Sequence, residues 1–445
     1  MHFHPLTDAD KDEMLKEIGV SGFNDLLQGI PSVLRHPKLD IPAGLSEFEV
    51  QNLLKERLGL NQSQSDLLSF LGGGSYDHFI PSAVAQIISR NEFYTAYTPY
   101  QPEASQGTLQ TIFEYQSLIS ELTGLDVANA SHYDGATAVA EAVLLALRHT
   151  GRSKILVSSS LHPHYRQTIR TYLKGTPYIM QEFAFDENGQ FSREDFMKHL
   201  DPQVGGAIFQ TPNFFGVVEN LMGVSESLHE AGALLIMASH PLSLSVFKSP
   251  GEWGADVAVG EGQPLGLTTQ YGGPYLGYFA VARSLMRKIP GRLVGITQDS
   301  KGRRAYVLTL KAREQDIRRE RASSNICTNQ ALCALTACVY MTLMGTLGIR
   351  EVAEINLDRA YYLRAEISKL PGFHVNVNLP IFNEFVVRSD KPFARISEIL
   401  KSHLILPGIN LDEFYPEMKN HFLVCATETK TKGDLDRYVE ALSQC

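Results

Sequence analysis

Apolar residues recur at helical spacing in the first part of the chain. One helix is predicted to open at Thr7–Asp10 and to stop at Gly19, and a second to open at the capping box Ser46–Glu49 and to end at Gly59. A proline-containing stretch separates the two helices. We expect residues 1–75 to form a helical N-terminal extension of the kind that packs across a neighbouring domain or subunit.

From about residue 105 to residue 285, short apolar runs alternate with helical patterns. Helices are expected at Thr108–Thr123 and Asp134–His149. Strands are expected at Lys154–Ser158, Gly206–Gln210, Ala233–Ala238, Ala255–Val259 and Tyr278–Arg283. Short buried strands that alternate with helices predict a mostly parallel sheet covered on both faces. This large α/β domain is expected to span residues 76–315.

The last third of the chain has a different pattern. A long helical region is expected at Arg313–Thr346, ending near Gly345, and a further helix at Leu357–Leu370. The alternating charges of Arg313–Arg321 are typical of a solvated helix face, with an anion site as the alternative. Short strands and helices follow at His374–Asn378, Glu384–Arg388, Ile396–His403 and Phe422–Cys425. We expect residues 316–445 to form a smaller C-terminal α/β domain.

Composition and charge narrow the classes of protein that fit these elements. The 445 residues are 44% hydrophobic and 20% charged, which is typical of a soluble globule with a large core. A net charge of −9 argues against a general affinity for nucleic acid. No membrane span and no secretory signal are expected. The five cysteines are odd in number and lack CxxC spacing, so we expect reduced thiols, a cytoplasmic location and no metal site.

Two segments offer backbone N–H groups to an anion. Leu71–Ser75 contains three glycines, but it lacks the GK[ST] ending of a P-loop and fits a flexible turn better. Asn129–Thr137 leads directly into the Ala-rich helix, and a helix N-terminus suits a phosphate. Asp134 can instead cap that helix, and its carboxylate would oppose a phosphate. Both alternatives stay open at Asn129–Thr137.

Gly254–Pro274 resembles the cofactor-holding segment of fold-type-I pyridoxal-phosphate (PLP) enzymes, in which a strand precedes a Gly-rich turn. Those aspartate aminotransferase-like transferases place the lysine that holds PLP just past the strand. Gln263 is the nearest counterpart here, and an amide cannot form a Schiff base. The strand Ala233–Ala238 leads to His240, which can simply end it against Pro241, and it offers no carboxylate to pair with the cofactor ring. The pattern predicts a PLP-transferase fold without a covalent cofactor site.

Tyr94–Glu103 packs three tyrosines, two prolines and one carboxylate into ten residues. Its poverty in aliphatic residues argues against a core segment. Tyrosines with polar tips suit an interface or the rim of a pocket. An ordered surface loop is the alternative.

Five long segments together resemble one family, the P-protein of the glycine cleavage system. They are YTPYQPEASQGTLQTIFEYQ, NASHYDGATAVAEA, FQTPNFFGVVE, GEGQPLGLTTQYGGP and RRERASSNICTNQALCAL. The resemblance covers essentially the whole chain and points to the first, alpha, subunit of the split form. In that family two homologous halves form the active unit, and the beta half carries the Schiff-base lysine in a His-Lys-Thr segment. Counted back from the shared Gly-Gly-Pro, Gln263 falls on that lysine.

The resemblance implies a glycine dehydrogenase (aminomethyl-transferring) activity that needs both halves. Glycine is decarboxylated with PLP carried by the beta subunit, and the aminomethyl group passes to the lipoyl arm of the H-protein. This chain is expected to hold no PLP covalently, to be inactive alone, and to assemble as two alpha and two beta chains. The candidates for an active-site or interface role are Tyr97, Tyr100, Gln101, Glu103, Ser131 and His132.

Two other functions are compatible with these features. An autonomous PLP enzyme would need another lysine, such as Lys248 or Lys288, although neither follows the expected strand. A scaffold would stabilise the lysine-bearing partner and contribute no side chain to its site. Sequence does not distinguish a scaffold from a contributing subunit, because it does not show whether a side chain crosses an interface.

Overall fold

The computed structural model describes residues 5–35, 37–62, 66–270 and 273–445. The chain forms two units, residues 1–63 and residues 64–445, and each is described by itself. The predicted domain boundaries near residues 75 and 315 stay predictions.

The N-terminal unit is helical, as predicted. It contains α1 (Asp8–Ile18), α2 (Phe23–Leu26), α3 (Ser32–Arg35) and α4 (Glu47–Leu58). Thr7 and Ser46 both form the predicted capping boxes, so the two longer helices begin where the sequence placed them. No described residue of these four helices is buried, and the unit therefore has no core of its own.

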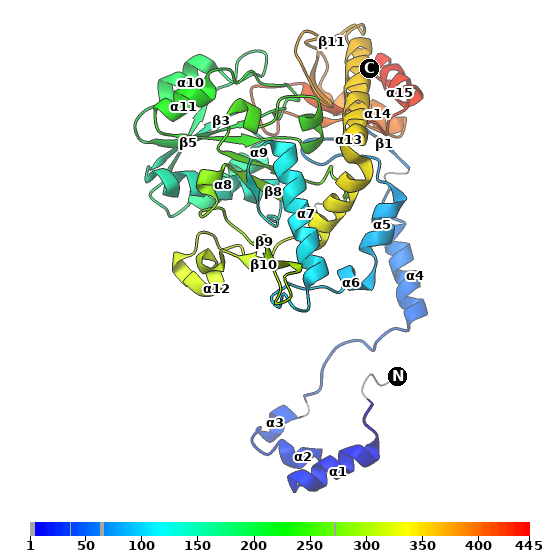
Figure 1. Ribbon diagram of the computed structural model, residues 1–445. Coiled ribbons are helices and arrows are strands. Elements are labelled where there is room, and N and C mark those ends of the chain that lie inside the picture. The colour runs from blue at the N-terminus through cyan, green and yellow to red at the C-terminus, as the bar shows by residue number, and fades with distance from the viewer. Residues whose placement is uncertain (1–4, 36, 63–65, 271–272) are drawn as a thin grey trace. The chain divides into compact units, whose positions relative to one another are not determined.

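A seven-stranded sheet organises the unit of residues 64–445 (Figure 1). In spatial order its strands are β2 (Val127–Ala128), β8 (Gly277–Val281), β7 (Val257–Glu261), β6 (Leu234–Ala238), β5 (Val204–Gln210), β3 (Lys154–Ser158) and β4 (Ile179–Phe183). Only β8 runs against its neighbours, so the predicted mostly parallel sheet is confirmed. Strand β4 was not predicted, because Gln181 and Glu182 interrupt the continuous apolar run that marks the other strands.

Helices cover both faces of this sheet. They are α7 (Gln106–Thr123), α8 (Gly135–Thr150), α9 (Pro163–Leu173), α10 (Arg193–His199) and α11 (Val224–Glu230). Successive residues of β5 point to opposite faces of the sheet: Ile208 packs with α8 and α9, whereas Phe209 packs with α10 and α11. This alternation explains why β5 is apolar at almost every position.

The longest helix, α13 (Ala331–Ile367), breaks at Gly345, whose φ of 60° lies in the left-handed region. The predicted helix end near Gly345 is thus confirmed, and the predicted helix at Leu357–Leu370 is the second half of α13. By length and composition α13 could cross a membrane, contrary to the expectation that no such segment exists. Half of its apolar window is buried inside the protein, which accounts for its hydropathy.

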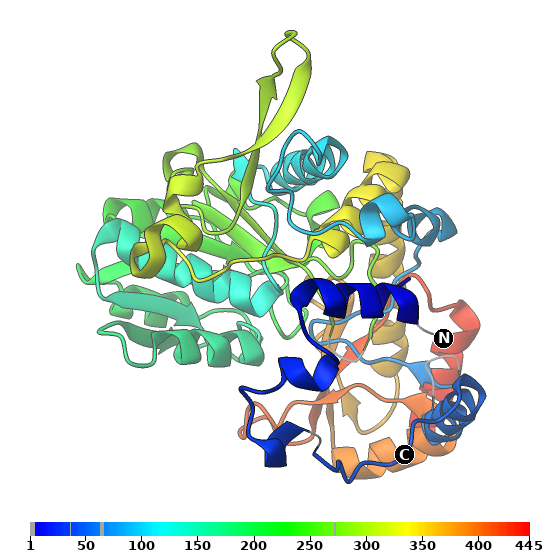
Figure 2. The ribbon, with the colours of Figure 1, turned by 90° about the horizontal axis from the view of Figure 1, so that it is seen from below.

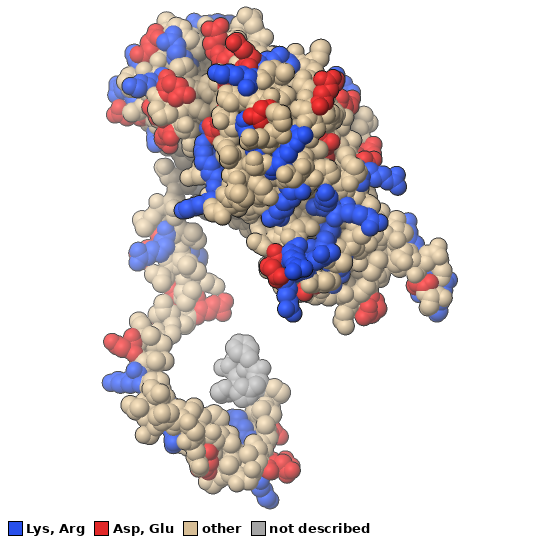
Figure 3. Space-filling model, turned by 90° about the vertical axis from the view of Figure 1, so that its left-hand side faces the viewer, with Lys and Arg blue, Asp and Glu red and all other residues tan. Residues whose placement is uncertain are grey.

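The predicted start of that helix at Arg313 is wrong. Residues 311–330 instead form the short elements η4 (Lys311–Arg313), α12 (Gln315–Arg318) and η5 (Arg319–Arg321), followed by loop. The charged segment has no apolar stripe to bury, so charge spacing alone does not hold a long helix together. Figure 3 shows Lys and Arg side chains gathered across the middle of one face, a local positive surface in a chain of net negative charge.

The C-terminal part adds a four-stranded antiparallel sheet. Its strands in spatial order are β11 (Phe373–His374), β12 (Glu384–Ser389), β15 (His421–Cys425) and β14 (Ile409–Asn410), and its helices are α14 (Phe393–Ser402) and α15 (Lys432–Ser443). A separate parallel pair joins β1 (Leu68–Ser69) to β13 (Ile405–Leu406). The chain therefore enters the unit beside its C-terminal sheet.

The remaining elements surround the large sheet. They are α5 (Ser82–Ile88), α6 (Asn91–Tyr94), η1 (Pro241–Ser245), η2 (Gly251–Trp253), η3 (Arg283–Leu285), β9 (Leu293–Gln298) and β10 (Arg304–Thr309). Strands β9 and β10 form an antiparallel hairpin that stands out from the rest of this unit (Figure 2). Its base packs on α7 through Val294, Tyr306 and Leu308.

Candidate functional site

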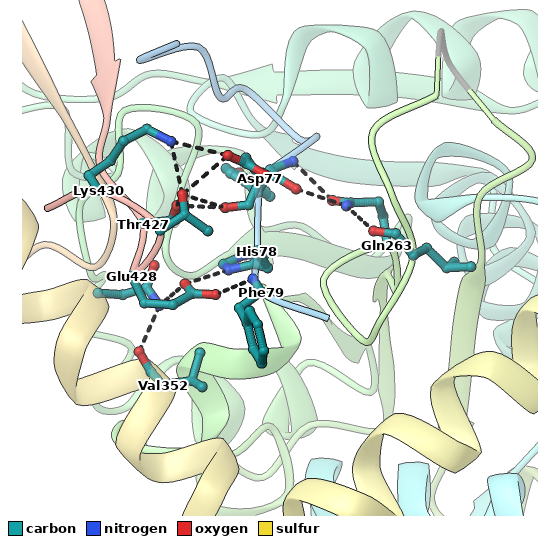
Figure 4. Close-up of polar contacts among 12 residues, drawn as sticks. Asp77, His78, Phe79, Gln263, Val352, Thr427, Glu428 and Lys430 are labelled. Atoms are coloured by element: carbon teal, nitrogen blue, oxygen red, sulfur yellow. Dashed lines mark hydrogen bonds and ion pairs between the residues drawn. The ribbon is translucent and has the colours of Figure 1, made fainter. Parts of the chain in front are cut away.

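Gln263 lies just past β7, as the sequence predicted, and its side chain is completely buried. Its amide oxygen accepts the N–H of Tyr76 at 2.9 Å, and its amide nitrogen donates to the carbonyls of Tyr76 at 2.8 Å and Leu267 at 2.7 Å (Figure 4). The amide thus serves as a bracket that fastens the Tyr76 backbone to the turn after β7. Where a PLP enzyme would hold its cofactor, this chain holds its own backbone.

Glu261 fills the neighbouring anion position at the start of α8. Its carboxylate accepts the N–H groups of Gly135 at 2.9 Å, Gln263 at 2.9 Å and Leu276 at 3.0 Å. Burial raises the pKa of Glu261 to about 8, although the three donors oppose that shift. A Cβ on Gly135 would come within 2.3 Å of Tyr165 Oη, so the helix start is packed tightly.

Asp134 caps α8, because its Oδ1 accepts the N–H of Thr137 at 2.8 Å. The capping alternative at Asn129–Thr137 is therefore confirmed. A phosphate at this helix N-terminus would face the Asp134 carboxylate, and the Gly135 N–H that would bind it is already donated to Glu261.

His240 lies at the end of β6, where PLP enzymes place an aspartate. Its ring contacts Tyr76 edge-on at 4.8 Å between centroids and Phe382 at 5.1 Å. Neither ring nitrogen has a hydrogen-bond partner among the described residues, and burial lowers the pKa of His240 well below its usual value. The residue is therefore a neutral aromatic wall, and it offers no charge to a pyridine ring.

A cavity of only about 30 Å³ remains between these groups. It is lined by Gly74, Tyr76, His162, Tyr165, Gln210, Pro212, Asn213, Ala238, Ser239, His240, Gly260, Glu261, Asn383 and Glu384. Since one water needs roughly 10–15 Å³, the space holds about two waters. PLP does not fit this cavity, because its volume is too small, no lysine is among its lining residues, and the Gly135 N–H at the start of α8 is already donated to Glu261. Neither Lys248 nor Lys288 lines this cavity, and Lys248 lies over the Trp253 ring instead.

The segment Tyr76–Phe79 connects this closed pocket to the C-terminal sheet. Glu428 accepts the N–H of Phe79 at 2.7 Å and lies 2.9 Å from His78 Nδ1, while Lys430 Nζ contacts Asp77 at 3.1 Å (Figure 4). Sequence reasoning missed these residues. Their partners lie about 350 positions away along the chain, so no local pattern signals the contact.

Glu384, the first residue of β12, binds the chain at Gly73 and Tyr76. It accepts the N–H of Gly73 at 2.6 Å and the hydroxyl of Tyr76 at 2.8 Å. The side chain is buried, and that burial raises its pKa to about 7. The glycine run Leu71–Ser75 is thus a turn that approaches Glu384 closely, in agreement with the turn alternative.

The tyrosine segment Tyr94–Glu103 is far more exposed than the pocket residues. Tyr97 is 74% exposed and Tyr100 is 50% exposed, and Gln101 and Glu103 are exposed as well. None of these four residues lines the closed cavity. They form a surface, which is what an interface role requires, although their contact with a partner stays a prediction.

Ser131 and His132 lie in the interior instead. Ser131 Oγ accepts hydrogen bonds from the Asn329 side chain at 2.9 Å and from the N–H of Gln330 at 3.1 Å. His132 stacks on Phe279 at 4.8 Å, and burial lowers its pKa to about 3. An interface role would need exposed side chains, and neither residue is exposed. The sequence places both residues just before the predicted helix, but their position along the chain does not show that they are buried.

Comparisons with known proteins agree with this fold and identify the family. Residues 1–442 match the family described as "Glycine cleavage system P-protein". The probable glycine dehydrogenase (decarboxylating) subunit 1 of Desulfitobacterium hafniense is 47% identical over all 445 residues, and the alignment covers 100% of each chain. That of Desulforamulus reducens is 48% identical and covers 98% of each chain.

Solved structures show the same fold. A crystal structure of glycine decarboxylase (P-protein) of the glycine cleavage system, in inhibitor-bound form, has a TM-score of 0.92 with 41% identity, and the match covers 100% of each chain. A glutamate decarboxylase of Lactobacillus brevis shares only the fold, with a TM-score of 0.69 and 13% identity over 93% of this chain and 96% of its own. The expected fold-type-I PLP-transferase architecture is therefore confirmed. Because the family model matches residues 1–442 and a relative is 47% identical over the whole length of both chains, the chain belongs to the glycine cleavage system P-protein family.

Proposed function

We propose that this chain is the alpha subunit of a glycine dehydrogenase (decarboxylating). Together with a lysine-bearing beta subunit it decarboxylates glycine and passes the aminomethyl group to the lipoyl arm of the H-protein. One observation carries the proposal: a family match over essentially the whole chain coincides with a pocket that Gln263 and Glu261 close. A chain that keeps the fold and loses its cofactor site needs a partner that holds PLP.

In this proposal the alpha subunit contributes surface and support. PLP supplies the electron sink for decarboxylation from the partner's site. Here Gln263 and Glu384 fix the segment that follows the glycine turn. Tyr97 and Tyr100 are the two tyrosines among the candidate residues, and both are exposed enough to reach a neighbouring site. Tyrosine is enriched at interfaces because its ring is apolar and its tip is polar.

The scaffold alternative has one observation in its favour. None of the six candidate residues lines the closed cavity beside Gln263. A purely supporting subunit would have the same closed pocket. The two alternatives differ in whether the exposed tyrosines touch the partner's site.

The assembly and its location are part of the proposal. Two alpha and two beta chains would place each closed pocket beside a lysine-bearing one. The five cysteines are free thiols, which suits a cytoplasmic complex.

The test is reconstitution with a lysine-bearing P-protein subunit and lipoylated H-protein. Each chain is expected to be inactive alone and the mixture to release CO₂ from glycine, with PLP reduced by borohydride onto the partner only. Light scattering should give the mass of two alpha and two beta chains. Decarboxylation by this chain alone, or a PLP adduct on it, would contradict the proposal.

Single substitutions decide between the active and the scaffold roles. Tyr97→Phe and Tyr100→Phe each remove one hydroxyl from an exposed ring and leave the packing intact. If the tyrosines reach the partner's site, at least one variant lowers turnover while the complex keeps its mass. Unchanged kinetics in both variants would favour the scaffold.

A further inference from the structure

A buried cation lies beneath the exposed tyrosine segment. Arg292 precedes β9 and is only 6% exposed. Its Nη1 donates to Thr98 Oγ1 at 3.3 Å, and its Nη2 donates to Tyr100 Oη at 3.3 Å. Its guanidinium also lies 5.5 Å from the centre of the Tyr100 ring. Two residues of the segment are therefore held by one side chain from a distant part of the sequence.

The counter-ion of Arg292 is further away than these hydroxyls. Glu314 Oε2 lies 3.9 Å from Arg292 Nε, which is beyond hydrogen-bond distance. Arg292 Nε and Glu314 Oε1 have no hydrogen-bond partner among the described residues. Arginine is almost never this buried without a partner, so the closest stabilising contacts of Arg292 are those to the tyrosine segment.

These contacts fix a tight turn. The N–H of Tyr100 donates to the carbonyl of Thr98 at 2.9 Å, and Pro99 between them is buried. Tyr97 comes immediately before the turn and is 74% exposed. A fixed turn therefore sets the direction in which Tyr97 leaves the surface.

A second contact holds Gln106, the first residue of α7, just past the end of this segment. The Gln106 side chain donates to the carbonyl of Tyr306 at 2.8 Å and accepts the N–H of Tyr306 at 2.9 Å. Lys311 Nζ lies 5.6 Å from the centre of the Tyr100 ring. The segment is thus a loop held by contacts with Arg292 and Lys311, and Tyr97 is among its exposed side chains.

We propose that Arg292 is a positioning residue of the composite site: it holds Thr98 and Tyr100 so that Tyr97 and Tyr100 meet the partner subunit in one prepared arrangement. This inference rests on the proposed function, because it needs a partner site for the tyrosines to reach. A loop that is ordered before association loses less conformational freedom on binding, and its groups stay aligned with the reacting centre.

The experiment uses the reconstituted complex with Arg292→Met and Arg292→Lys. Methionine keeps the length of the stem and removes all donors, and lysine restores one cation that can reach only one of the two hydroxyls. We expect the methionine variant to lower kcat on the order of 10- to 100-fold with an unchanged complex mass, and the lysine variant to recover part of that loss. Arg303→Met, at the exposed tip of the hairpin, is the matched control and should leave kcat unchanged.

Two further measurements separate positioning from a general structural role. Arg292→Met combined with Tyr100→Phe and Thr98→Val should lose little beyond the methionine variant alone, because all three changes break one unit. In the isolated full chain, chymotrypsin should cleave after Tyr97 or Tyr100 faster in the methionine variant than in the control.

Each outcome decides the matter. Unchanged kcat in an assembled Arg292→Met complex, additive losses, or unchanged cleavage would overturn the positioning role. If the wild-type complex shows no glycine decarboxylation, the proposed function fails and the cleavage rates still judge whether Arg292 holds the loop. If the methionine variant does not fold, the lysine variant carries the same comparisons.

Discussion

Replacing Gln263 by alanine tests whether the glutamine is a structural bracket. The change removes the partners of three backbone groups, the N–H and carbonyl of Tyr76 and the carbonyl of Leu267, in a completely buried place. An unpaired buried polar group costs about 1–3 kcal/mol, so Gln263→Ala should lower the free energy of unfolding by about 3–6 kcal/mol, once water replaces part of the amide.

Urea unfolding of the isolated chain measures this loss. Far-UV circular dichroism and the fluorescence of Trp253, the single tryptophan, report on different parts of the chain. Coincident transitions would justify a two-state free energy. Gln270→Ala is the control, because Gln270 is an exposed glutamine of the same turn with one weak contact at 3.4 Å. A loss below about 1 kcal/mol for Gln263→Ala, the net worth of a single ordinary hydrogen bond, would refute the reasoning.

Gln263→Lys extends the same argument to the chemistry. The ammonium group can donate to the two carbonyls, yet it leaves the Tyr76 N–H unpaired and brings a charge into a buried place. We therefore expect destabilisation and no PLP adduct at residue 263 after borohydride reduction, as read by peptide mass spectrometry. An adduct there would mean that the pocket opens far more easily than its 30 Å³ cavity indicates.

Three further predictions concern carboxylates in and around the pocket. Burial raises the pKa of Glu384 to about 7 from an unperturbed 4.5, so the folded state favours the protonated form, and this contribution is fully present below pH 4.5 and lost as pH rises to about 7. Glu384→Gln should flatten the pH dependence of the unfolding free energy by at most about 3 kcal/mol over that range, and an unchanged slope would contradict the assignment. Asp134→Ala removes the cap of α8 and should cost about 1 kcal/mol in urea unfolding, whereas Asp134→Asn should cost much less. Glu428→Ala leaves the Phe79 N–H without its partner, so hydrogen exchange of that amide should quicken by about tenfold or more per 1.4 kcal/mol lost, while the amides of α1 stay unchanged.

Local chemistry explains which parts of this fold the sequence predicts. The capped ends of α1 and α4 and the apolar runs of β5 and β6 are set by neighbouring residues, so they are found within a residue or two. The long helix from Arg313 was wrong because charge spacing was taken for a helix without an apolar stripe. The charge pattern near Arg313 does not show whether a helix formed there would have a face to bury.

The candidate site likewise combines features that the local sequence predicts with contacts that it does not. The position of Gln263 after its strand is a local feature, and the sequence locates it. The contact with Tyr76 spans 187 positions, and the contacts of Glu384 and Glu428 span more than 300. Such pairs arise only from the packing of the large sheet against the C-terminal one. Sequence therefore showed that the lysine is missing, while the structure shows what the glutamine does in its place.

The way Glu261 and Gln263 share the turn after β7 has a consequence for how this protein can evolve. The backbone N–H of Gln263 binds the same carboxylate that holds the start of α8, so a substitution at Glu261 loosens both the turn and the helix start, and a substitution at Gln263 loosens the Tyr76 backbone. A lineage that regained the lysine first would carry a destabilised chain without a new activity to select for. A return to a cofactor-binding chain by single substitutions would thus pass through intermediates less stable than the present chain. Mutations that enlarge this pocket should therefore accumulate only in chains whose stability exceeds what folding requires.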